Sequence, residues 1–142
     1  MSRIGALRLL REIFGTVVIT NVIAEEFGEQ IPEWIKVREA ENTNYRQLLE
    51  ATLDSGEASA IALAIELDGV LLVVDDLKAR KEAIRLGLKI IGTLGILYKG
   101  KVTGLIPFIK PYLDKLQQEG FRIAPKIVTE LLNRAGEAEG VL

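Results

Sequence analysis

Apolar residues recur along the chain at spacings that predict helices and short buried strands. Residues 3–13 repeat apolar positions at the helical interval, so a helix is predicted at the start of the chain. The β-branched run "TVVIT" at 16–20 predicts a strand, and "VLLVV" at 70–74 has no polar alternation. An unbroken apolar run of that length is typical of a parallel strand covered on both faces.

Gly and Pro separate the other periodic segments and mark where helices begin and end. Thr20 can cap the helix "NVIAEEF", which Gly28 ends, and Pro32 is well placed to begin a helix over "PEWIKVREA". Asp54 or Ser55 can cap the helix in "GEASAIALAIEL". A further buried strand is predicted at 89–93, and further helices at about 44–52, 77–87, 94–102, 106–120 and 124–136.

Strands that alternate with helices predict an α/β fold, here a three-layer α/β/α sandwich with a mostly parallel sheet. The short linkers favour a single domain over residues 1–142, with C-terminal helices from about residue 105. In such sheets ligands bind beyond the carboxyl ends of the strands. Asp75 and Asp76 follow "VLLVV" at such an end.

Composition narrows the chemistry that this sequence can perform. Hydrophobic residues make up 49% and charged residues 27% of the sequence, as in globular domains. The sequence holds neither Cys nor His, which excludes disulfides, thiolate nucleophiles, Cys/His zinc sites and Ser-His-Asp triads within it. Carboxylates remain, and they prefer hard cations such as Mg²⁺ or Mn²⁺. No apolar run reaches the roughly 18 residues of a membrane span and no signal peptide is evident, so we expect a cytoplasmic protein without membrane contact.

Three acids around the apolar segment 53–76 have both a structural and a functional interpretation. Glu57 lies three residues after Asp54, the spacing of a capping box, but it could also point at the rim where Asp75 and Asp76 lie. Asp76 could be only the N-cap of the next helix, whereas Asp75 has no evident local backbone role. Two adjacent carboxylates repel each other, and a divalent cation or a basic partner relieves that repulsion.

Other charged residues are less specific. Glu25 and Glu26 lie in the helix after the first strand and could simply be solvated. Between Leu77 and Lys101 seven basic residues stand against Glu82 alone, a net charge of about +6. This segment is either a solvated helix face or a surface that attracts a polyanion toward the adjacent acids.

Together these residues resemble the PIN-domain superfamily, in particular PIN-like nucleic-acid-binding proteins of prokaryotes that are related to VapC-type toxins. The most specific part is "LDSGEASAIALAIELDGVLLVVDDLKARKEAIRLGLKIIGTLGIL", which holds the GEA, DD-x-KAR and GLK-x-IGT-x-G elements in order. The segments "RIGALRLLREIFG" and "VIAEEF" resemble the family more weakly.

The resemblance implies a site in which carboxylates at the strand ends hold Mg²⁺ or Mn²⁺, which activates water to cleave RNA. By matching motifs, Glu26, Glu57 and Asp76 would be the metal ligands, and Asp75 a ligand or an orienter of bound water. The same resemblance implies nucleic-acid contacts by Lys78, Arg80 and Thr93.

One departure from the family concerns the first strand. The family usually begins with a strand reading roughly Ser-Asp-Thr/Ser-Ser-Pro-Leu-Ile, whereas this sequence starts at Met1, inside or just before the helix that follows it. The resemblance implies that this strand is central and carries the first metal-binding Asp. We therefore expect a gap between "TVVIT" and "VLLVV", and self-association, as a dimer, in compensation. A start further upstream, closure of the gap by the flanking strands or by a second subunit, and a protein that binds without cutting all stay open.

The first hypothesis is a metal-dependent ribonuclease of the toxin type, weak or inactive in this form, with RNA as substrate and an antitoxin protein as partner. The competing hypothesis is a non-catalytic nucleic-acid-binding or protein-interaction module with the same fold. A third is a structural oligomer whose acids only cap helices.

Overall fold

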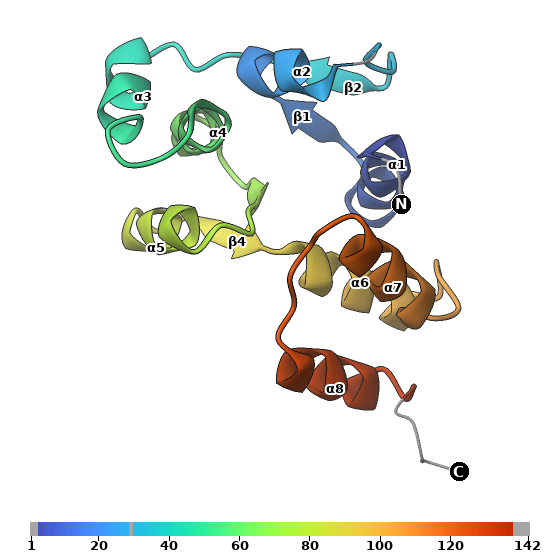
Figure 1. The fold of residues 1–142 in the computed structure, drawn as a ribbon. Coiled ribbons are helices and arrows are strands. Elements are labelled where there is room, and N and C mark those ends of the chain that lie inside the picture. The colour runs from blue at the N-terminus through green and yellow to red at the C-terminus, as the bar shows by residue number, and fades with distance from the viewer. Residues whose placement is uncertain (1–2, 29, 138–142) are drawn as a thin grey trace. The chain divides into compact units, whose positions relative to one another are not determined.

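The computed structural model describes residues 3–28 and 30–137, and the chain divides into two compact units (Figure 1). The sheet unit is residues 16–93, and the helical unit is residues 1–15 together with 94–142. The sheet unit contains β1 (Val17–Ile19), α2 (Asn21–Phe27), β2 (Ile35–Val37), α3 (Thr43–Leu49), α4 (Ser55–Glu66), β3 (Leu71–Val73), α5 (Leu77–Arg85) and β4 (Lys89–Ile91). The helical unit contains α1 (Arg3–Phe14), α6 (Thr93–Val102), α7 (Lys110–Gln118) and α8 (Pro125–Arg134), with Thr93 itself belonging to the sheet unit.

The four short strands form two separate parallel pairs. In the first pair Val18 of β1 lies opposite Lys36 of β2, and in the second Leu72 of β3 lies opposite Ile90 of β4. Over the described residues no strand pairing joins the two sheets. The helices and parallel strands confirm the predicted α/β fold, while the three-layer sandwich and the missing central strand stay predictions.

The prediction of a helix over "PEWIKVREA" is wrong, because this segment contains the strand β2. Pro32 lies in a turn, in which its carbonyl accepts the Ile35 N–H at 3.1 Å. Ile35 is buried, and the Arg38 N–H continues the pairing by donating to the carbonyl of Ile19 at 2.9 Å. The β-branched Ile35 and Val37 favour a strand, and the hydrogen bonds to β1 outweigh the local preference of Pro32 for a helix start.

Helix α4 runs through the core of the sheet unit. Ala58, Ile61 and Ala62 are at most 2% exposed, and the helix lies against α2, α3, α5 and β3 (Figure 1, green). A helix that is apolar around most of its circumference belongs in an interior. Its many small residues allow the neighbouring elements to approach closely, so α4 fixes how they are arranged around it.

Strand β3 is covered on one face only, which corrects the expectation that "VLLVV" is covered on both. Leu72 and Val74 are buried, whereas Leu71 is 38% and Val73 40% exposed. Successive side chains of a strand point to opposite faces, so the two exposed residues share one face. The apolar run therefore places part of its hydrophobic surface in water.

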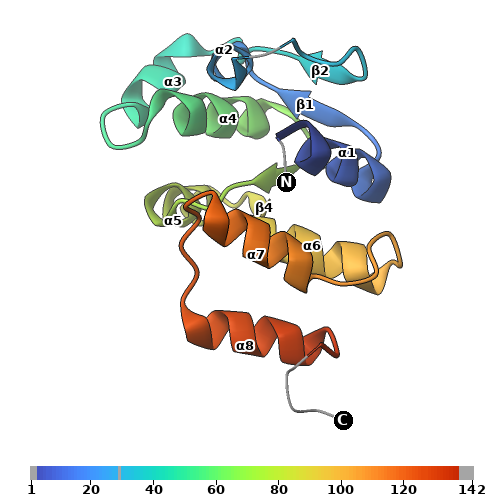
Figure 2. The ribbon, with the colours of Figure 1, turned by 45° about the vertical axis from the view of Figure 1, so that its right-hand side comes forward.

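The helical unit has an apolar core of its own. Leu97, Ile109 and Leu113 are at most 1% exposed, and α6 and α7 run alongside each other in both views (Figure 2). The buried Ile106, between α6 and α7, packs against α6 at Gly100, where an added Cβ would lie 3.4 Å from its side chain. Among the described residues, no helix has the combined length and apolarity that a membrane span requires.

A nearly buried carboxylate holds the end of the helical unit in place. Glu137 accepts hydrogen bonds from the N–H groups of Ile109 and Lys110 and from Nζ of Lys101. Burial alone would raise the pKa of Glu137, but these donors outweigh it and hold the pKa below its ordinary value. These hydrogen bonds give Glu137 a structural role.

Candidate functional site

Glu57 lies in the first turn of α4, and capping accounts for only part of its environment. Asp54 is the N-cap, and its Oδ1 accepts the Glu57 N–H at 2.9 Å. In a complete capping box the Glu57 carboxylate would accept the Asp54 N–H in return. No such bond is present in the described part of the chain, so the Glu57 side chain has no structural role as a cap.

The Glu57 carboxylate is electrostatically unfavourable in the metal-free fold. Its partial burial is the main reason why the pKa of Glu57 is raised, and the negative charges of Asp54, Asp76 and Glu26 raise it further. Asp75 is not among these charges. Glu26 and Asp76, which the resemblance implies as metal ligands together with Glu57, therefore both act on Glu57 from neighbouring elements.

Glu26 reaches the same helix turn because Gly56 has no side chain. A Cβ on Gly56 would lie 2.8 Å from Oε2 of Glu26 and 3.2 Å from its Oε1. The Glu26 carboxylate, on α2, is thus held close to the start of α4, one residue from Glu57. Glycine at this position leaves the space that the carboxylate occupies.

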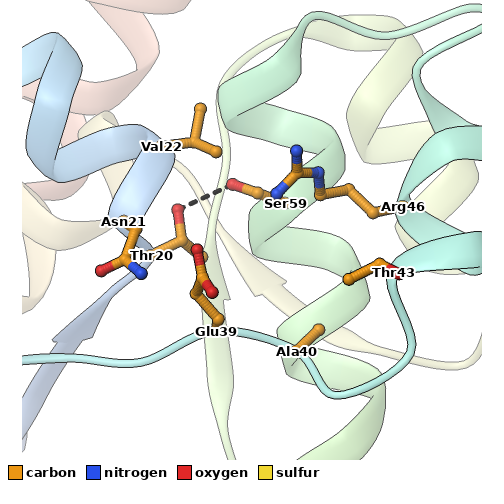
Figure 3. A pocket seen from close by; sticks show the side chains of 8 residues that line it. All are labelled: Thr20, Asn21, Val22, Glu39, Ala40, Thr43, Arg46 and Ser59. Atoms are coloured by element: carbon orange, nitrogen blue, oxygen red, sulfur yellow. Dashed lines mark hydrogen bonds between the residues drawn. The ribbon is translucent and has the colours of Figure 1, made fainter.

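A buried hydroxyl pair fixes α2 against α4 (Figure 3). The two hydroxyls, of Thr20 and Ser59, are 2.7 Å apart. Ser59 donates its only hydroxyl hydrogen to the carbonyl of Gly56 at 2.8 Å, so Thr20 must be the donor in the pair. Thr20 in turn accepts the N–H of Ile23 as the N-cap of α2. The chain of bonds therefore links the helix that carries Glu26 to the helix turn that carries Glu57.

The two adjacent aspartates have different partners. Asp76 is the N-cap of α5, and its Oδ2 accepts the Ala79 N–H at 3.0 Å. Asp75 accepts two hydrogen bonds from Thr93, from the N–H at 2.8 Å and from the hydroxyl at 2.6 Å. Since the Thr93 hydroxyl gives its hydrogen to Asp75, its oxygen can only accept from other groups. Thr93 in this state suits contact with a water molecule rather than with a phosphate oxygen.

The predicted phosphate-contacting residues both lie on α5, beside Asp76. Nη1 of Arg80 donates to the carbonyl of Val74 at 2.9 Å, which holds the half-buried guanidinium at the end of β3. Lys78 is exposed. Arg80 is thus preorganised by the fold, whereas Lys78 presents its charge to solvent.

The cavity of the sheet unit is separate from these acids. It measures about 20 Å³, room for roughly one water molecule, and lies where β1 and β2 end (Figure 3). None of the four predicted acids lines it. Its lining residues are Thr20, Asn21, Val22, Glu39, Ala40, Thr43, Arg46 and Ser59.

The acids fit a divalent cation in donor chemistry but do not form a closed cage. Over the described residues, no three acidic side chains are close enough together to hold a metal ion. Mg²⁺ commonly takes only one or two protein carboxylates and completes its shell with water and substrate phosphate. One or two of Glu26, Glu57 and Asp76 would therefore be enough for the protein part of an open site.

Comparison with known proteins identifies the family. A family model described as PIN domain matches residues 1–137. The chain belongs to the PIN-domain family. No curated protein and no solved structure matches the chain.

Membership of the PIN-domain family indicates a nuclease-like protein that binds nucleic acid, and PIN domains generally depend on a divalent metal. The seven residues predicted as the site lie on α2, α4, α5, the end of β3 and the start of α6. Gly56 and Gly92 belong to the GEA and IGT elements of the sequence, but neither glycine was assigned a role, although each directly precedes a candidate residue. A glycine beside a candidate acid was the signal that could have identified Gly56 in this PIN domain.

We predict that Glu57→Gln stabilises the metal-free PIN domain at neutral pH. The unfolded chain releases the Glu57 proton at a lower pH than the folded chain, whose pKa is raised. The free energy of unfolding therefore falls as the pH rises from the ordinary pKa of a glutamate through the raised pKa of Glu57 in the folded state. Glutamine does not ionise, so the variant does not lose this stability. Thermal unfolding in EDTA should show little difference between variant and wild type at about pH 4 and a higher midpoint for the variant at about pH 7.

Glu66→Gln, at the other end of α4, is the matched control for this measurement. Glu66 accepts the N–H groups of Glu41 and Asn42, which lower its pKa, so its loss should destabilise the fold. Added Mn²⁺ should raise the midpoint of the wild type more than that of Glu57→Gln. Destabilisation by Glu57→Gln at neutral pH would contradict the interpretation of Glu57 as an unfavourable charge.

We predict that Gly56→Ala weakens Mn²⁺ binding without destabilising the fold. The new Cβ would displace the exposed carboxylate at the end of the flexible Glu26 side chain, while alanine suits a helix better than glycine by up to about 1 kcal/mol. Titration calorimetry with Mn²⁺ should give the same reduced affinity for Gly56→Ala, for Glu26→Gln and for the double variant. Wild-type affinity in Gly56→Ala would show that Glu26 does not bind metal from this position.

Proposed function

We propose that this PIN domain is a metal-dependent ribonuclease that hydrolyses phosphodiester bonds of RNA. The observation that supports it best is the environment of Glu57, whose pKa is raised by burial and further by the charges of Asp54, Asp76 and Glu26. An ionised group that the fold does not stabilise is typical of a functional site. A divalent cation is the ligand that would relieve the repulsion by these charges.

In this proposal Glu26, Glu57 and Asp76 hold Mg²⁺ or Mn²⁺. When bound, the ion would lower the pKa of a coordinated water molecule and neutralise the charge that develops on the phosphate. Arg80, anchored on the carbonyl of Val74, and the exposed Lys78 attract and orient the RNA backbone. Because no three acids are gathered over the described residues, we expect weak metal binding and low activity.

We predict that Asp76→Asn lowers Mn²⁺-dependent cleavage of single-stranded RNA by at least about tenfold. Asparagine caps a helix as well as aspartate does, so α5 keeps its N-cap while the candidate ligand loses its charge. The assay follows cleavage of a fluorescent RNA with Mn²⁺ and with EDTA. The exposed Asp68, in the turn after α4, provides the matched control Asp68→Asn, which should cleave like the wild type.

The same assay decides between this proposal and a non-catalytic binding module. The alternative is supported by the lack of a ready-made three-acid cluster in the described residues. RNA binding without Mn²⁺-dependent cleavage in the wild type would establish the alternative. Cleavage that Asp76→Asn leaves unchanged would refute the assignment of the metal site. The toxin type and an antitoxin partner stay predictions.

We further propose that the chain self-associates as a dimer. Each described strand has a partner on one side only, and Leu71 and Val73 place apolar side chains in water. Open strand edges and exposed apolar strand faces promote pairing with a second chain.

We predict a dimer in analytical ultracentrifugation, which Val73→Lys should convert to a monomer. Lysine on an apolar contact surface is unfavourable because its charge must be desolvated. Leu77→Lys is the control, because Leu77 on α5 is 65% exposed and lies outside the strands. A wild-type monomer at all concentrations tested would contradict self-association.

A further inference from the structure

The junction after β4 has a set of contacts that the proposed metal site does not explain. Asp75 lies two residues after β3, and Thr93 begins α6 two residues after β4. Both oxygens of Asp75 accept a hydrogen bond from Thr93. Hydrogen bonds of this kind, with an ionised acceptor, are stronger than those between neutral groups.

Gly92 allows this arrangement to be compact. A Cβ at Gly92 would lie 2.9 Å from Oδ1 of Asp75 and 3.0 Å from Nη1 of Arg80. The carboxylate and the guanidinium therefore approach the same point above the backbone. Arg80 is held there by its bond to the carbonyl of Val74. Asp75, Arg80 and Thr93 thus form one group that joins the ends of β3 and β4.

Asp76 and Asp75 differ in how many of their carboxylate oxygens accept hydrogen bonds. Its Oδ2 accepts the Ala79 N–H, and within the described residues its Oδ1 accepts no hydrogen bond. Asp75 has both oxygens engaged by Thr93. A carboxylate with both oxygens already accepting hydrogen bonds is a poorer metal ligand than one with an oxygen that accepts none.

We propose that Asp75 is a positioning residue that acts through Thr93, and not a metal ligand. It holds the Thr93 hydroxyl so that the oxygen can only accept, which orients an O–H donor such as a water molecule at the strand ends. The functional part of this inference rests on the proposed nuclease activity. The pairing of Asp75 with Thr93 is tested independently of it.

A double-mutant cycle on thermal stability in EDTA tests the pairing. Thr93→Val removes the hydroxyl, keeps the N–H and should lower the unfolding midpoint by about 5 °C in the wild-type background. In the Asp75→Ala background, which leaves the hydroxyl without its side-chain acceptor, Thr93→Val should have little further effect. In the wild-type background Thr93→Ser, which keeps a hydroxyl, should keep the wild-type midpoint. In the Asp76→Asn background Thr93→Val should lower the midpoint by as much as in the wild type. Additive effects of Asp75→Ala and Thr93→Val would overturn the proposal.

Titration calorimetry with Mn²⁺ tests whether Asp75 binds metal. Asp76→Asn should weaken binding at least about tenfold, and Asp75→Asn less than about threefold. Equal losses in the two variants would overturn the proposal. On RNA, Asp75→Asn and Thr93→Val should lower kcat and leave KM unchanged, with recovery of kcat in Thr93→Ser.

The two proposals fail in different ways. If the wild type neither binds Mn²⁺ nor cleaves RNA, the proposed function is wrong, and the stability cycle still decides the pairing. If metal binding and cleavage are present but the cycle is additive, the assignment of Asp75 is wrong and the nuclease proposal stands.

Discussion

The arrangement of the sheet unit depends on the buried hydrogen bond between Thr20 and Ser59. Both residues are 3% exposed, and a hydroxyl buried without a partner would be strongly unfavourable. Thr20 meets this requirement by capping α2 and donating to Ser59, and Ser59 by donating to the carbonyl of Gly56. Helix α2 can therefore take only one position along α4. That position places Glu26 over Gly56 and beside Glu57, so a contact between two hydroxyls helps to set the distance between two candidate ligands.

Hydrogen bonds from backbone N–H groups distinguish Glu66 and Glu137 from Glu57. Glu66 and Glu137 accept backbone N–H groups, which lower their pKa, and each fixes a helix start. Glu57 has no comparable donor for its carboxylate in the described residues, and its pKa is raised. A fold that stabilises some carboxylates this fully and leaves one under repulsion is under a constraint other than stability. PIN domains generally depend on a divalent metal, and the proposed cation beside Glu57 would provide such a constraint.

Local signals in the sequence predicted most helices and their caps correctly, because capping depends on residues close along the chain. Thr20, Asp54 and Asp76 are N-caps as expected, and Gly28 ends α2 in the left-handed conformation with φ of 69°. Strand β2 was missed because its identity depends on pairing with β1, and Pro32 locally suggests a helix. The exposed face of β3 was missed because an apolar run shows no asymmetry between its two faces.

The candidate site was predictable to the extent that it follows from topology. Strand ends and helix starts bring Glu57 and Asp76 to one edge of a parallel α/β fold, and the sequence shows both positions. The sequence left Asp75 open between a ligand and an orienter of bound water, because its partner Thr93 lies 18 residues further along the chain. The contact between Glu26 and Gly56 joins α2 to α4, which requires the packing of Thr20 against Ser59.

The division of roles between Asp75 and Asp76 follows from backbone geometry. Adjacent residues in extended conformation direct their side chains to opposite sides. Val74 continues the pairing of β3 by donating to the carbonyl of Ile91 at 2.9 Å, so the chain is still extended as it enters the aspartate pair. One carboxylate is thereby directed toward the neighbouring strand end, where it meets Thr93, and the other toward α5 and Glu57. The two carboxylates therefore have separate protein partners, and their adjacency alone is no argument for a shared metal. The proposed cation at this rim is supported instead by the charges of Asp54, Asp76 and Glu26 around Glu57.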